Sequence, residues 1–217
     1  MVTGRGASQE RSRERRERLL RAAVELIAQR GVKAATHRAV AAHAGLPAPT
    51  TGYYFSTTAQ LIEEALKYHV ERRVGELGLL LDGATAGATS LEDLGQSVAR
   101  ALITGASTTG LAQYEVYLEA ARNPALRAAV AASTAAFEQV ASVRLAALGI
   151  RDHRRAAQAF VALADGFALH RFAFPQTFDE ELELLRNGLR GLFLSYALEE
   201  SEVSSLIASI TPSLPGR

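Results

Sequence analysis

The chain has 217 residues, of which 48% are hydrophobic and 22% charged, and a formal net charge of +1, as expected for an ordinary folded protein of one or two domains. It has no cysteine, which excludes disulfide bonds, thiolate metal sites and cysteine nucleophiles. Its five histidines lack metal-binding spacing, so we expect no metal and no cofactor. No stretch has the length of a transmembrane helix or the apolar core of a signal peptide, so we expect a cytoplasmic protein without a membrane partner.

Charge is distributed unevenly along the chain. Residues 1–60 contain ten Lys and Arg but four Asp and Glu, a net charge of +6, which leaves −5 for the remainder. A basic N-terminal quarter on an acidic body is typical of a head that binds a polyanion. An ordinary solvated basic helix explains the charge equally well.

Apolar residues recur at helical spacing almost throughout, and no run of alternating β-branched residues indicates a sheet. The sequence predicts helices over residues 12–30, 37–44, 47–54, 58–74, 90–104, 111–122, 124–148, 152–172 and 178–198. Good N-caps precede several of them, namely Thr36, Asn123 and Thr177, and Gly45 and Gly149 follow helices as stops. Gly75, Gly78 and Gly83 weaken the end of the helix that contains residues 58–74, and residues 82–89 are expected to form a loop. Residues 1–11 and 211–217 are expected to be disordered.

Two short helices joined by a glycine-containing turn, residues 36–55, have the dimensions of a helix-turn-helix. In that arrangement the N-terminal half of the second helix faces base edges in the major groove. Small side chains and hydroxyls occupy that half here: Pro47, Ala48, Pro49, Thr50 and Thr51. Phe55 is expected to fill the core beneath the motif.

At these residues the chain resembles the tetracycline-repressor (TetR) family of transcriptional regulators. The family typically shows Ala-Gly, an aliphatic residue, a small cluster, and aromatics that end in Phe ten residues after the Gly. This chain reads Ala44-Gly45-Leu46-Pro47-Ala48-Pro49-Thr50-Thr51-Gly52-Tyr53-Tyr54-Phe55. The preceding segment, from Arg38 to His43, and the following one, from Ser56 to Leu61, also resemble the family.

The resemblance implies a DNA-facing set, with Arg38 and Thr50 as the base-edge contacts: Thr36, Arg38, Ala48, Thr50, Thr51, Tyr53 and Tyr54. Thr36 is also an N-cap, and Tyr54 is alternatively a core aromatic. Two positions depart from the family pattern. Gly52 stands where many members have a phosphate-contacting Tyr, and Thr58 where a Lys is common.

The body after the head shows no catalytic constellation, so we expect no enzyme. The last two predicted helices are apolar on more than one face. The resemblance implies that they form a homodimer interface, whereas the alternative is the core of one monomer. It also implies a pocket for an unknown small-molecule effector, with these candidates: Tyr114, Glu115, Tyr117, Phe137, Asp165 and His170.

Two acidic features of the body have ordinary explanations. Glu115 and Glu119 share one helical stripe, so they need a cation, and Arg122 or another Arg is the simplest source. Asp165, within an apolar helix, needs a partner such as His170, Arg171 or a cationic ligand group.

The sequence thus predicts an all-α protein with an N-terminal three-helix helix-turn-helix DNA-binding domain and a C-terminal helical bundle for ligand binding and dimerisation. The expected divisions are a disordered basic arm (1–11), the DNA-binding domain (12–57), the ligand-binding and dimerisation domain (58–200) and a tail (201–217). The expected function is that of a regulator, a repressor released from a palindromic double-stranded DNA operator by its effector. The alternatives are a helical enzyme or ligand carrier, or a protein-interaction adaptor with a degenerate head.

Overall fold

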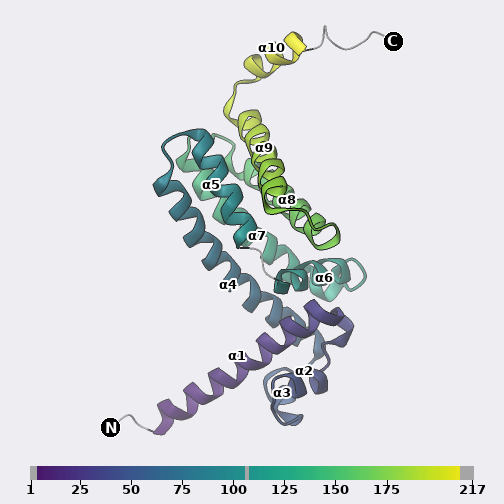
Figure 1. Ribbon diagram of the computed structural model, residues 1–217. Coiled ribbons are helices and arrows are strands. Elements are labelled where there is room, and N and C mark those ends of the chain that lie inside the picture. The colour runs from purple at the N-terminus through teal and green to yellow at the C-terminus, as the bar shows by residue number, and fades with distance from the viewer. Residues whose placement is uncertain (1–3, 106–107, 211–217) are drawn as a thin grey trace. The chain divides into compact units, whose positions relative to one another are not determined.

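The structure is a computed structural model that describes residues 4–105 and 108–210 (Figure 1). The described residues form ten α-helices and three short 3-10 turns, so the expected all-α class is confirmed. They divide into two compact units, residues 1–77 with 105–136, and residues 78–104 with 137–217. Each unit contains two separate segments of the chain.

The first unit begins with α1 (Gly4–Arg30), η1 (Val32–Ala34), α2 (His37–His43) and α3 (Pro49–Tyr54). Figure 1 shows α2 and α3 together below the second half of α1. One face of α1 supplies the core of this group with fully buried side chains, among them Leu19, Leu20, Ala23 and Ile27. α1 starts eight residues earlier than expected, so most of the segment predicted to be disordered is helical.

Caps define the ends of α2 as the sequence predicts. Thr36 Oγ1 accepts a hydrogen bond of 3.2 Å from the Ala39 N–H, which satisfies one free donor of the first turn. Gly45 follows the helix with a φ of 63°, in the left-handed region where a side chain would be strained. Arg18 adds a contact that the sequence did not indicate: its Nη2 donates to the Ala44 carbonyl at 2.6 Å and so fixes this end of α2 on α1.

α4 (Thr58–Gly87) runs through the loop expected at residues 82–89, so that prediction is wrong. Thr57 Oγ1 caps its start by accepting from the Gln60 N–H at 3.1 Å. In the second unit, the Arg144 guanidinium donates to the Gly78 carbonyl at 2.9 Å and to Asp82 at 2.6 Å. These bonds from a distant part of the chain stabilise the glycine-containing turns of α4.

The first unit continues with η2 (Thr108–Gly110), α6 (Leu111–Ala120), η3 (Pro124–Leu126) and the first half of α7 (Arg127–Ala147). α6 packs on α1 and on η1, so it belongs to the same compact group as the N-terminal helices. Asn123 caps η3 as predicted, with its side chain accepting from the Ala125 N–H at 3.2 Å.

The second unit is built around α5 (Leu91–Thr104), α8 (His153–Ala173) and α9 (Phe178–Ala197). α9 packs on both α5 and α8. Leu182, Leu185 and Leu189 of α9 are buried with Ala99 and Ile103 of α5. Thr177 and Glu180 form the expected capping box at the start of α9.

Two features of the second unit explain how tightly its helices pack. A Cβ placed on Gly188 of α9 would lie 3.4 Å from Leu163 of α8, so the glycine permits a close helix crossing. Arg171 of α8 donates to Glu181 of α9 at 2.5 Å and to the Ile103 carbonyl of α5 at 3.1 Å. One side chain therefore joins all three helices.

α10 (Glu200–Ile210) occupies most of the segment expected to be a C-terminal tail. Residues 211–217, which were predicted to be disordered, lie outside the described residues. Within the described part of the chain, no helix is long and apolar enough to cross a membrane.

Candidate DNA-binding surface

The turn between α2 and α3 is held by short backbone bonds and a buried aromatic ring. The Leu46 N–H donates to the Ala41 carbonyl at 2.9 Å, and the Thr50 N–H to the Pro47 carbonyl at 2.9 Å. Phe55, directly after α3, is fully buried as predicted, and the Arg16 guanidinium lies 5.8 Å from its ring centroid. The two short helices therefore form a fixed helix-turn-helix on α1.

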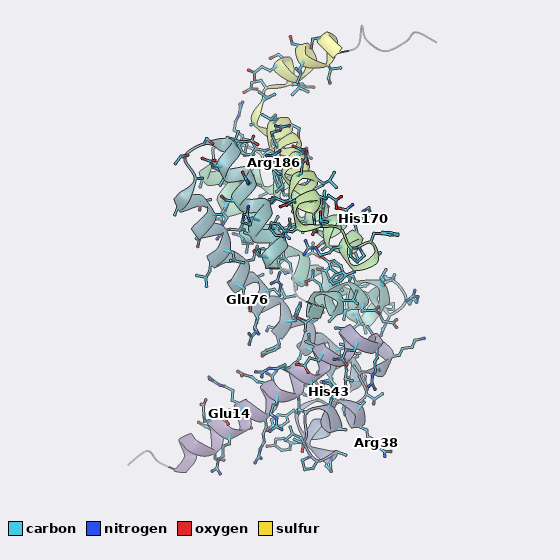
Figure 2. The ribbon with its side chains drawn as sticks, in the orientation of Figure 1. Glu14, Arg38, His43, Glu76, His170 and Arg186 are labelled. Atoms are coloured by element: carbon cyan, nitrogen blue, oxygen red, sulfur yellow. The ribbon has the colours of Figure 1, made fainter. Side chains whose placement is uncertain are left out.

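Most of the predicted DNA-facing side chains lie on the open side of this scaffold. Thr36, Arg38, Ala48 and Tyr53 are exposed, and Thr50 is half-buried. Figure 2 shows Arg38 extending away from the ribbon. A cation, hydroxyls and a phenol that are accessible to solvent can reach phosphate oxygens and base edges.

Thr51, which was predicted to contact DNA, is not exposed on this surface. Its side chain is fully buried, and among the described residues its Oγ1 has no hydrogen-bond partner. Neighbouring residues on a helix point about 100° apart, so when Thr50 faces outward Thr51 turns into the core.

Tyr54 is tied to α1. Its hydroxyl donates to the Ser12 carbonyl at 3.1 Å and lies 3.0 Å from Ser12 Oγ. Its ring meets Tyr53 edge-on, with 5.0 Å between centroids. This partner explains why the aromatic is only partly exposed, and it makes Tyr54 a residue that positions α3.

The arginines of α1 have different roles in the structure. Arg16 pairs with Glu64 of α4, and Arg13 pairs with Glu10 at 3.4 Å on the same helix. Arg18 caps α2, as described above. Arg15 is exposed. The sequence could not separate these roles, because the partners are up to 48 positions away.

The two departures from the family pattern are both exposed. A Cβ placed on Gly52 would have nothing within 4 Å, so the backbone there would accommodate a larger residue. Thr58 is the first residue of α4. His43, which is exposed, bonds to Glu25 of α1 at 2.9 Å.

Three effector candidates lie on α6 in the first unit, where Tyr117 is the centre of a polar network. Its hydroxyl accepts from Gln113 Nε2 at 3.1 Å and lies 3.0 Å from Ser133 Oγ and 3.4 Å from Thr134 Oγ1. Tyr114 is buried with its ring edge-on to that of Tyr117, and Glu115 is half-buried. The sequence analysis missed Ser133 and Thr134 as partners of Tyr117, because small hydroxyls carry no signal until α6 and α7 are placed together.

The other three effector candidates belong to the second unit. Phe137 and Asp165 are half-buried, whereas His170 is exposed beside Phe174. Arg171, one suggested partner of Asp165, binds Glu181 and Ile103. Glu119 of the first unit pairs with Arg122 at 3.7 Å, as the simplest explanation predicted.

His69 of α4 is a buried ionisable group that the sequence analysis did not single out. Only 6% of its surface is exposed, and its Nε2 has no hydrogen-bond partner among the described residues. The pKa of His69 is lowered from 6.5 to about 4; burial is the main cause, Arg73 and Arg72 also lower it, and Glu76 opposes them. His69 is therefore neutral at pH 7. Within residues 4–105 and 108–210, no three His, Asp or Glu side chains gather in a way that could hold a metal ion.

The fold and this surface define a helix-turn-helix DNA-binding protein. Two family profiles match the chain: "Bacterial regulatory proteins, tetR family" over residues 19–65, and "Tetracyclin repressor-like, C-terminal domain" over residues 89–194. The chain belongs to the TetR family of transcriptional regulators, which are DNA-binding proteins and not enzymes.

Solved structures and a curated relative agree with this assignment. The multidrug binding protein EbrR, in complex with ethidium, is 30% identical to this chain. The match covers 82% of this chain and 98% of the EbrR chain, with a TM-score of 0.61. A TetR-family transcriptional regulator from Rhodococcus sp. is 25% identical over 83% of this chain and 98% of its own, with a TM-score of 0.69. The transcriptional repressor KstR2 of Mycolicibacterium smegmatis is 35% identical over 72 residues. That match spans only 33% of this chain and 35% of KstR2.

Proposed function

We propose that this regulator is a repressor that binds a palindromic operator as a homodimer and leaves it when a small molecule binds. The observation that carries the proposal is the exposed edge of α2 and α3, which presents Thr36, Arg38 and Tyr53 on a fixed scaffold. KstR2, with which the chain shares a 72-residue match, is described as a repressor, and this supports repression in particular.

For operator recognition, Arg38 and Thr50 would contact base edges, and Thr36, Ala48 and Tyr53 would complete the surface against the duplex. Arg15 would add a phosphate contact. Tyr54 would act by holding α3 on α1. Functionally, residues 12–57 would be the DNA-binding domain and residues 58–200 the part that binds effector and partner.

The homodimer would form through α8 and α9. Leu169, Leu184 and Leu194 on these helices are each at least 40% exposed, which supports a partner on this pair of helices. A single six-residue reading helix makes few contacts, whereas two related by a two-fold axis can read a palindrome. Sedimentation velocity tests this proposal: Leu184→Glu should give monomers, and the control Leu79→Glu, at an exposed leucine of α4, should not. A wild-type monomer would contradict the proposal.

The effector would contact the candidates on α6 of the first unit, Tyr114, Glu115 and Tyr117. Phe137, Asp165 and His170 belong to the second unit and stay predictions of the sequence analysis. EbrR, which is similar to this chain, forms a complex with ethidium, and this supports a small-molecule site here. Ethidium is therefore the first probe to use. Calorimetry on DNA-free protein should detect binding that Tyr114→Ala weakens. Equal binding to both proteins would remove Tyr114 from the site.

The experiment that tests the function as a whole is fluorescence anisotropy on DNA from upstream of the gene, with scrambled DNA as the control. Affinity for the native fragment should be higher, and it should fall steeply between about 50 and 200 mM salt as counterions are released. Failure to bind any DNA at low salt would contradict the proposal. It would favour a ligand carrier or an adaptor instead.

A further inference from the structure

Gly31 forms a left-handed junction between α1 and η1. It adopts φ 77° and ψ 169°, while its N–H donates to the Ile27 carbonyl at 2.8 Å and closes α1. A residue with a Cβ would be strained in this conformation, so the direction in which the chain leaves α1 depends on the glycine.

A side chain from α6 rests on this junction. A Cβ placed on Gly31 would lie 3.3 Å from Glu115 Oε2 and 3.9 Å from Glu115 Cδ. The contact lies within the first unit, where α6 packs on both α1 and η1. Glu115 stands beside Tyr114 and two residues before Tyr117, which are both effector candidates.

The connector from residue 31 to residue 36 is short and internally bonded. The N–H groups of Ala34, Ala35 and Thr36 donate to the carbonyls of Gly31, Val32 and Ala34 at 2.9 to 3.1 Å. The side chains of Val32 and Ala35 are buried. Thr36 then caps α2, whose second residue is Arg38. The connector therefore has little freedom to absorb a displacement at Gly31 before the DNA-facing end of α2.

We infer that Glu115 is a positioning residue through which α6 fixes the 31–36 connector, and with it the DNA-facing start of α2. The inference rests on the proposed function, because it assumes that α6 contacts the effector. A shift of α6 on effector binding would move Glu115 and release or displace the connector. This gives the effector site a direct mechanical link to Thr36 and Arg38 inside one compact unit.

Three variants of the full-length protein test this inference. Glu115→Ala removes the contact, Glu115→Gln retains its shape, and Glu119→Ala removes a carboxylate one turn further along α6 that pairs with Arg122. Anisotropy on the upstream DNA should show that Glu115→Ala weakens specific binding by roughly three- to tenfold. Binding to scrambled DNA should not change, and Glu115→Gln and Glu119→Ala should behave as wild type.

Hydrogen exchange supplies a second readout that needs no DNA. In Glu115→Ala the amides of Ala34, Ala35 and Thr36 should exchange faster, while in Glu119→Ala they should not. A double-mutant cycle with Gly31→Ala should be non-additive, because Glu115→Ala relieves the steric part of the Gly31 substitution.

The outcomes separate the two proposals. If wild-type protein binds no DNA specifically, the proposed function fails, and the exchange data still test the contact. If the wild type binds its operator but Glu115→Ala matches it in affinity and exchange, the inference alone is overturned. Equal effects of Glu115→Ala and Glu119→Ala would also overturn it, because they would indicate a general weakening of α6.

Discussion

The Tyr54 hydroxyl donates a hydrogen bond of 3.1 Å to the Ser12 carbonyl and so joins α3 to the first half of α1. Ser12 lies 42 positions earlier in the chain, within α1, which begins at Gly4. The length of α1 and the position of the recognition helix are therefore linked.

Loss of the Tyr54 hydroxyl should destabilise the head. Tyr54→Phe removes the hydrogen bond to Ser12, and we expect the free energy of unfolding to fall by about 1 kcal/mol. Urea denaturation followed by circular dichroism measures this change. Tyr53→Phe is the matched control. Tyr53 is 81% exposed, so removal of its hydroxyl should leave the free energy of unfolding unchanged. A Tyr54→Phe protein as stable as wild type would show that the bond is not formed in solution.

Arg38 and Arg15 should give different binding signatures. Arg38→Ala should cost about 1–3 kcal/mol on the operator and relax sequence preference, as expected for a base contact. Arg15→Ala should weaken binding to all DNA alike and reduce the salt slope by about 1, as expected for a phosphate contact. Anisotropy titrations at several salt concentrations distinguish the two. An equal loss of random-sequence binding in Arg38→Ala would contradict the base contact.

Replacing Thr51 with valine should stabilise the protein. Its buried hydroxyl has no partner among the described residues, so Thr51→Val removes a polar group without opening a cavity. We expect stability to rise by about 1 kcal/mol and operator affinity to stay the same. Thr50→Val, at the half-buried neighbour, should instead lower operator affinity. Reduced DNA binding in Thr51→Val alone would restore Thr51 to the DNA-facing set.

His69 should make the protein less stable in mild acid. Its pKa is about 4 in the folded protein and 6.5 when unfolded, so the unfolded chain binds more protons between these values. The contribution of His69 to the free energy of unfolding is therefore fully present above pH 6.5. It decreases as the pH falls toward 4, by up to about 3 kcal/mol.

Denaturant titrations at pH 7 and pH 4.5 measure this effect. His69→Leu should lose much less stability between the two pH values than wild type, while the exposed His170→Gln should behave like wild type. Identical pH dependence in wild type and His69→Leu would mean that His69 is accessible to solvent in the folded state.

Local features of the sequence were sufficient for the helices and for the family. The helical spacing, the caps at Thr36, Asn123 and Thr177 and the left-handed Gly45 depend on neighbours within a few residues, so their positions could be predicted closely. The helix-turn-helix has the same local character. Its glycine turn and closing aromatics lie within twenty residues, and the motif was enough to indicate the TetR family and the general function.

Sequence reasoning failed where distant parts of the chain decide the outcome. The glycine-containing turns of α4 were expected to form a loop, but Arg144 bonds to them from more than sixty residues away. Likewise, Arg16 and Arg18 are both among the ten basic residues of the N-terminal quarter, and the sequence does not distinguish them. In the packed structure, Arg16 contacts Glu64 and Phe55, whereas Arg18 bonds to the end of α2.

The sequence by itself determined that this is an all-α regulator with a helix-turn-helix head, because caps, turns and periodicity act over short distances. Tertiary structure alone decided which residue of each neighbouring pair faces outward. On a six-residue helix, periodicity cannot fix the rotation of the helix about its axis. The sequence therefore does not show which of Thr50 and Thr51, or of Tyr53 and Tyr54, faces outward. Packing on α1 sets that rotation, because burying Phe55 and bonding Tyr54 to Ser12 leaves a single orientation for the helix.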